Sequence, residues 1–163
     1  MGLACLPMRS LLAAITLLSA AGVAGAADLQ LKRVWPQWHD ADSFQSFYED
    51  HTGRELTGGW IVLRSQPDQR RGLYFLTRVE NPGAQVPGAA FVLRVISPES
   101  IDVRVFSFPA DVPKGSKLFE LGLTGGDWPG ARYQPVAWEL EVQGADGSVM
   151  ARKTSFLWEK PSR

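Results

Sequence analysis

The sequence predicts a mainly β protein, an antiparallel β-sandwich of about seven to eight strands with one short helix near its N-terminus. Three observations support this fold class. Apolar and polar residues alternate with a period of two over most of the chain after Asp28. Clusters of Gly, Pro, Asn and Asp separate the alternating runs at spacings typical of sandwiches and barrels. One stretch, Asp42–Gly53, has helical spacing instead.

The N-terminus is not expected to belong to the folded domain. Arg9 is the only charged residue before Asp28, and it precedes the apolar run LLAAITLLSAAGVAG, which is short for a membrane span. Small residues over Ala24–Ala26 then provide a cleavage site. We therefore expect residues 1–26 to be a cleaved signal peptide and residues 27–163 to form a single domain. An uncleaved N-terminal anchor is the alternative.

The composition narrows the class of partner. The chain holds 17 Lys and Arg residues and 17 Asp and Glu residues, with the two signs interspersed. Because no basic patch emerges, we expect neither nucleic acid nor an anionic membrane as a partner. The one cysteine, Cys5, lies in the predicted signal peptide ahead of the apolar run, so we expect neither a disulfide nor lipidation. These features fit a protein that is periplasmic, secreted or on a bacterial cell surface, with no transmembrane segment after cleavage.

The elements follow in chain order. Leu29–Trp35 has the composition of a short first strand. Asp42–Gly53 has apolar residues at 44, 47 and 48, a capping residue before them and a glycine stop, so we expect a helix whose aromatic face covers an end or edge of the sheet. Five β-branched and aromatic runs then predict strands. They are Trp60–Ser65, Gly72–Glu80, Ala89–Ser97, Ile101–Phe108 and Lys117–Leu123.

The chain ends in a predicted hairpin. In Pro135–Gln143 every second residue is apolar, which is typical of a half-buried strand. Gly144–Gly147 is rich in residues that tolerate a positive φ, and Ser148–Trp158 forms the second strand. The expected inner face consists of Val136, Trp138, Leu140 and Val142.

Several of these segments also resemble a known architecture. The series GLYFLTRVENPG, AAFVLRVIS, FSFPADVPKGSKLFELGL and PVAWELEVQGADGSVMARKTSFLW resembles the strand series of bacterial immunoglobulin-like or fibronectin-type sandwiches, over roughly residues 58 to 158. The chain is also similar to small exported bacterial proteins of uncharacterised function that carry TGRE, GLTGxDWP and a terminal SFLW. The resemblance implies an immunoglobulin-like sandwich without the cysteine pair of antibody domains. Such sandwiches serve adhesion, scaffolding and ligand binding, so the resemblance leaves the function open.

The candidate ligand-binding residues are Trp35, at the end of the predicted first strand and next to Pro36, and Trp38, Asp127 and Trp128 in predicted loops. Indoles displayed by loops of a rigid sandwich stack on the C–H faces of sugar rings, although buried indoles that cap the ends of a sandwich are common. The tetrapeptide LTGG precedes Trp60 directly and Trp128 by one residue, which we interpret as one turn chemistry used twice. Trp60 runs straight into a strand, whereas Trp128 stays in a loop and is expected to be freer for display.

A metal site is not expected. His39, Asp40, Asp42 and His51 supply suitable ligand atoms, but their spacing matches none of the tight pairs that make zinc motifs specific. Asp40 or Asp42 is better interpreted as a helix cap, and His51 as a cation near the helix C-terminus.

Catalysis has no clear signature either. The chain lacks a Gly-x-Ser-x-Gly elbow, and the carboxylates Glu139 and Glu141 alternate on a strand face that we interpret as solvated. The arginines at 64, 70 and 71 could grip a phosphate or carboxylate, although a solvated loop is the simpler interpretation.

The sequence therefore favours an exported, non-catalytic binding or structural module that acts through loops or a sheet edge, without a cofactor. Its expected partner is a protein or glycan of the cell envelope. Two alternatives stay open: a carbohydrate-binding module that uses the loop tryptophans, and a metal-dependent enzyme around His39 and His51.

Overall fold

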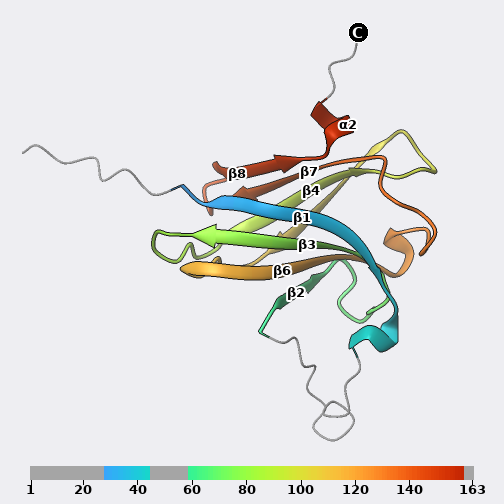
Figure 1. Cartoon of the computed structure of the whole chain (residues 1–163), viewed down its shortest axis with the longest axis horizontal. Coiled ribbons are helices and arrows are strands. Elements are labelled where there is room, and N and C mark those ends of the chain that lie inside the picture. The colour runs from blue at the N-terminus through green and yellow to red at the C-terminus, as the bar shows by residue number, and fades with distance from the viewer. Residues whose placement is uncertain (1–27, 45–58, 160–163) are drawn as a thin grey trace, which may run out of the picture.

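The computed structural model describes residues 28–44 and 59–159. This part of the chain is mainly β, with eight strands in two four-stranded sheets that pack face to face (Figure 1). The predicted fold class is confirmed at this level. None of the helices in the described ranges is long and apolar enough to cross a membrane. The predicted signal peptide and Leu56–Gly58 of the first LTGG lie outside the described residues.

The chain builds most of the first sheet before it crosses to the second, and β6 is the one later strand that returns to the first sheet among those the structure describes. The first sheet has the order β1-β3-β6-β2 and the second has the order β5-β4-β7-β8. All neighbours are antiparallel except β2 and β6, which run parallel. The first sheet contains β1 (Gln30–His39), β2 (Ile61–Arg64), β3 (Gly72–Asn81) and β6 (Gly115–Thr124); the second contains β4 (Ala90–Ile96), β5 (Val103–Pro109), β7 (Ala137–Gln143) and β8 (Val149–Thr154).

The structure departs from the predicted elements at three places. β1 runs on through Trp38 to His39, because it is an edge strand, where the missing N–H of Pro36 is tolerated. The predicted N-terminal helix is not seen: only a 3-10 turn, η1 (Ala41–Phe44), is described, and residues 45–53 lie outside the described ranges. The last strand stops at Thr154, and a one-turn helix, α2 (Phe156–Glu159), follows.

The core lies between the two sheets and is built from the alternating apolar positions. Phe91 of the second sheet meets Phe119 of the first with ring centroids 4.5 Å apart, and Phe75 meets the edge of Trp138 at 5.9 Å. Trp138 is 8% exposed, as the alternation predicts. Val136, expected on the same inner face, lies just before β7 and is exposed.

β6 is threaded between two strands that are consecutive in the chain, β2 and β3. The connecting segment, residues 65–71, must therefore arch over the end of β6; we call it the arch. The Thr124 hydroxyl accepts the Gln66 N–H at 3.1 Å and donates to the Gln66 carbonyl at 3.0 Å. Tyr74 reaches across from β3, where its hydroxyl donates to the Arg70 carbonyl at 2.6 Å and accepts from Arg64 Nε at 2.9 Å. The arch is thus fastened on both sides of β6.

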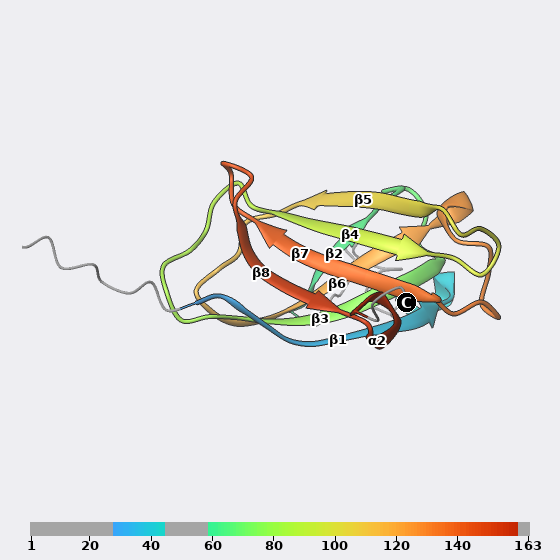
Figure 2. The same ribbon diagram turned by 90° about the horizontal axis from the view of Figure 1, so that it is seen from above.

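The two lateral sides of the sandwich differ. On one side β8 lies beside β1, and Lys153 Nζ donates to the carbonyls of Leu31 and Lys32 at 3.2 and 3.0 Å (Figure 2). On the other side the edge strands are β2 and β5, and within the described residues no hydrogen bond joins those two strands. The sandwich is therefore fastened along one side and open along the other.

Gly122 offers a direct test of how closely Tyr74 packs on β6. A Cβ at Gly122 would lie 2.5 Å from Tyr74 Cε1, so we expect Gly122→Ala to destabilise the fold by about 1–3 kcal/mol through overpacking. The matched control is Gly126→Ala, because a Cβ there meets no atom within 4 Å. Urea denaturation of both variants measures the difference, and equal stabilities would contradict the close packing.

Candidate functional site

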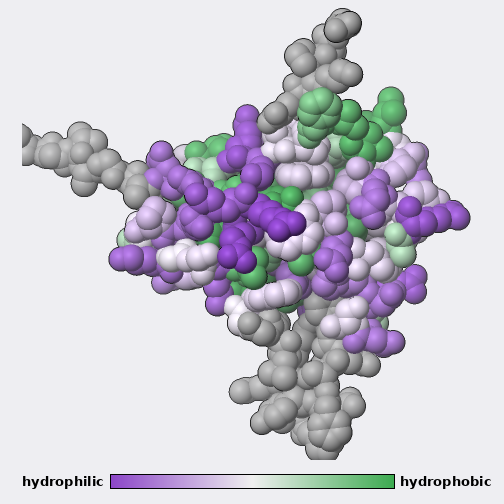
Figure 3. Space-filling view, in the orientation of Figure 1, coloured by the Kyte–Doolittle hydropathy of each residue, from purple (hydrophilic) through white to green (hydrophobic). Residues whose placement is uncertain are grey.

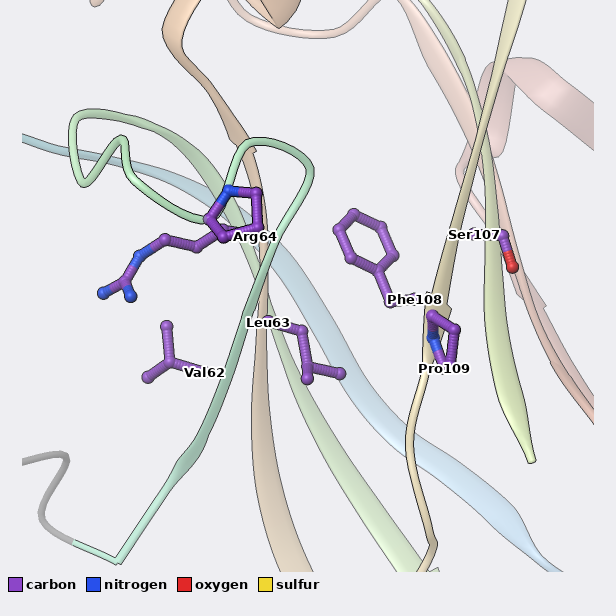
Figure 4. Close-up of a pocket in the computed structure, with 7 residues that line it drawn as sticks. Val62, Leu63, Arg64, Ser107, Phe108 and Pro109 are labelled. Carbon is purple, nitrogen blue, oxygen red and sulfur yellow. The ribbon is translucent and has the colours of Figure 1, made fainter. Parts of the chain in front are cut away.

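The open side carries a groove between β2 and β5. Its volume is about 280 Å³. Leu63 and Phe108 point toward one another across it, one from each sheet (Figure 4). Both are apolar, and Phe108 belongs to the core, so the floor of the groove is continuous with the interior. The lining residues are Val62, Leu63, Arg64, Pro67, Ser107, Phe108 and Pro109.

One wall of the groove is a strand edge with free backbone groups. Ala110 donates to the carbonyl of Ala89, its partner in register, so alternate residues of β5 face β4 with their N–H and C=O groups. The residues between these positions turn their N–H and C=O groups away from β4; they are Val103, Val105 and Ser107. Among the described strands, β5 pairs only with β4. The side chains of Val103 and Val105 are 48% and 59% exposed, so this edge combines hydrogen-bonding capacity with apolar surface.

Asp127 holds one end of the open side together. Its carboxylate accepts from Arg104 of β5 at 3.1 Å and from Gln66 of the arch at 3.2 Å. Arg104 also donates to the Asp127 carbonyl at 2.8 Å. Both carboxylate oxygens are thereby engaged, and this candidate ligand-binding residue has a structural role between β5 and the arch.

The three candidate tryptophans do not form one platform. Trp35 and Trp38 both lie in β1, not in a loop, and on opposite faces of the first sheet, because side chains alternate along a strand. Arg33 lies over Trp35 at 4.6 Å, whereas Trp38 packs against the core. Trp128 is only 3% exposed, and its Nε1 donates to the Tyr133 carbonyl at 3.1 Å. Trp128 is therefore not displayed as expected, because its loop folds back over the core. Trp60, which leads directly into β2, is 41% exposed.

Trp38 and Trp128 nevertheless share a second cavity, which we call the end hollow. It measures about 510 Å³ and lies where β6 passes into the 3-10 turn η2 (Gly125–Asp127). Arg71 of the arch lines it and lies over the Trp38 ring at 5.8 Å. The predicted arginine cluster is therefore divided: Arg64 bonds to Tyr74 on the outer face of the first sheet, and Arg71 faces the end hollow.

No group of three or more His, Cys, Asp or Glu side chains in residues 28–44 and 59–159 is placed to hold a metal ion. His39 lies against Tyr74 with ring centroids 5.1 Å apart, and burial lowers the pKa of its imidazole. Asp40 accepts from the Trp38 indole at 3.0 Å. His51, the other histidine of this hypothesis, lies outside the described residues.

Glu139 and Glu141 are buried, contrary to the solvated face expected from the sequence. Arg94 Nη1 contacts both carboxylates, at 2.9 and 3.0 Å, and Arg152 Nε donates to Glu141 at 2.9 Å from β8. Burial alone would raise the pKa of Glu141, but hydrogen bonds from Arg94, Gln143 and Arg152 outweigh it and lower the pKa to about 2. The alternating pattern of β7 does not reveal this network. Arg94 and Arg152 lie beside Glu141 only because β7 pairs with β4 on one side and β8 on the other.

Exposed apolar side chains also gather over α2, where Phe156 and Leu157 face solvent (Figure 3). Single exposed apolar residues are ordinary on a folded surface, and we assign no ligand to this region.

Comparison with models of protein families, with curated proteins and with solved structures finds no match for this chain.

The Glu141 network predicts a specific pH dependence. Because the pKa of Glu141 is lowered from 4.5 to about 2 on folding, its ionised form stabilises the protein above pH 4.5, and this contribution is lost as the pH falls through about 2. Relative to Glu141→Gln, the free energy of unfolding of the wild type should therefore drop by about 3 kcal/mol between pH 6 and pH 2. Urea denaturation across this range measures the difference.

The control for this experiment is Glu99→Gln at an exposed turn, which should run parallel to the wild type. A gap between wild type and Glu141→Gln that stays constant with pH would contradict the assignment.

Proposed function

We propose that the protein is an exported, non-catalytic binding module that takes up an extended segment of a partner protein along the free edge of β5. The observation that carries this proposal is the open side of the sandwich, where outward-facing backbone groups border an apolar groove. An added strand gains main-chain hydrogen bonds, each worth about 1 kcal/mol net, and places alternate side chains in pockets. The N-terminal sequence is the reason for proposing that the protein is exported and that its partner belongs to the cell envelope.

The groove defines the partner's chemistry. A strand beside β5 would turn every second side chain inward, and the inward side chain nearest Ser107 would meet Leu63 and Phe108 in the groove, so that position should be apolar. The intervening side chains would lie beside Val103 and Val105 on the outer face and can be polar. A suitable partner segment is therefore extended and alternates apolar with polar residues.

Two features of β5 restrict this pairing. Pro109 has no N–H to donate, and Arg104 is an inward-pointing charge. Natural edge strands use such residues to prevent indiscriminate pairing. The usable edge is therefore short, spanning Val103 to Ser107, which favours a partner segment matched in register over general association.

The immunoglobulin-like type of sandwich is part of the same proposal. The order β1-β3-β6 corresponds to strands A, B and E of such a fold, and β5-β4-β7-β8 corresponds to C′, C, F and G. β2 is then an addition beside strand E, and it supplies the second wall of the groove. The three-indole sugar platform is not proposed, because Trp35 and Trp38 face opposite ways and Trp128 is buried.

Val105 provides the test of strand addition. Val105→Pro removes one outward N–H without breaking the pairing of β5 with β4, whereas Val105→Thr keeps the N–H and the shape of the side chain. We expect the wild type and Val105→Thr to capture the same envelope protein, and Val105→Pro to capture at least about tenfold less, because the new strand loses a hydrogen bond and meets the proline ring.

Hydrogen exchange locates the contact in the captured complex. The amides of Val103, Val105 and Ser107 should exchange more slowly than in the free protein. Equal capture by the proline variant, or protection confined to β1 and β8, would refute strand addition at β5.

A further inference from the structure

We propose that the end hollow is a binding site for a sugar acid, a small hydroxylated ring that carries a carboxylate. This inference goes beyond the proposed function, because the end hollow and the β2/β5 groove share no lining residue. Its volume of about 510 Å³ lies within the range of small-molecule sites and accommodates one or two sugar rings.

Arg71 supplies the charge that selects the ligand. Its guanidinium lies over the Trp38 ring at 5.8 Å and, within residues 28–44 and 59–159, forms no ion pair. Stacking on an indole holds a guanidinium in place while leaving its in-plane N–H groups free, and this fork matches a carboxylate in bidentate fashion. The geometry therefore favours an anionic group bound to the edge of Arg71.

The nearby acidic side chains are already engaged. Asp127 accepts from Arg104 and Gln66, and Asp40 accepts from the Trp38 indole. Neither residue lines the end hollow. Among the described residues that line the end hollow, Arg71 is thus the one charged side chain, and none of them would set a carboxylate against a bound carboxylate.

The remaining walls suit a hydroxylated ring. Gly125, Gly126 and Gly130 present backbone without side chains, and a Cβ at Gly126 or Gly130 would meet no atom within 4 Å. The Gly125 N–H donates to the Arg71 carbonyl and the Gly130 carbonyl accepts from Tyr133, so Gly126 is the glycine whose backbone groups we propose contact the ligand hydroxyls, which are both donors and acceptors. The half-buried indole of Trp38 offers apolar surface to the C–H face of the ring beside Arg71, whereas Trp128 is only 3% exposed.

Calorimetric titration with three probes tests this site. Glucuronate carries both the ring and the carboxylate, glucose carries the ring alone, and acetate carries the carboxylate alone. We expect glucuronate to bind the purified protein at least about tenfold more tightly than either of the others, since each lacks one of the two contacts.

Two variants and a control assign the binding to the end hollow. Arg71→Gln should weaken glucuronate binding at least about tenfold, and Gly126→Leu should abolish it by filling the open space. Lys114→Gln removes the same charge at the opposite end of β6, from an exposed lysine, and should change nothing. Thermal unfolding of each variant verifies that the fold is retained.

The proposal is overturned if glucuronate does not bind, if glucose or acetate binds as tightly, or if Arg71→Gln binds like the wild type. The Val105→Pro variant should bind glucuronate normally, so a failure of strand addition and a failure of this site give different results.

Discussion

The architecture of the open side depends on one hydroxyl, that of Thr124. It accepts from the backbone N–H of Gln66 and donates to the carbonyl of the same residue, so both backbone groups of Gln66 are satisfied at the end of β6. Ser65 adds the reverse contact by accepting the N–H of Thr124 at 3.0 Å. Buried backbone groups need such partners, and here a side chain supplies them where a parallel pair ends. The parallel ladder with β6 holds β2 itself, and the Thr124 contacts fix the arch that leaves it.

The arch connects the two candidate sites. Its first half contributes Pro67 to the groove, and its second half contributes Gln69 and Arg71 to the end hollow. Gln66 binds Asp127, which also holds Arg104 of β5. The arch is thus held in place at both candidate sites. Loops that a rigid sandwich holds in place often carry the residues that bind ligands. Displacement of the arch would alter the groove and the end hollow together.

The sequence predicted the strands well because alternation is a local property. Gly72–Glu80 and Pro135–Gln143 were recognisable from their own residues, and the structure places strands there. Pairing is not local: nothing within Trp60–Ser65 indicates that β2 runs parallel to a strand more than 50 residues later. The burial of Glu141 could not be predicted from the sequence for the same reason, because its arginine partners come from two neighbouring strands.

The candidate site residues show the same limit. Trp128 lies among glycines and a proline, which predicts a loop, but local composition does not say whether a loop folds back over the core. Trp38 was expected in a loop because Pro36 precedes it, and the edge position of β1 makes that proline acceptable. The sequence indicates Arg71 only as one of a cluster of arginines. Its place in the end hollow depends on its distance to the Trp38 ring, which the sequence does not reveal.

The threading of β6 between β2 and β3 also dictates an order of assembly. β2 leaves the ribosome long before β6, yet β6 is the only described strand with which it pairs. Contacts between distant segments form slowly, because the loop entropy must be lost before any contact rewards it. β3 and β6 can join first as an antiparallel pair, and β2 then closes on the exposed flank of β6. β2 therefore cannot take its place as a wall of the groove until β6 has joined the sheet, and until then the flank of β6 stays exposed.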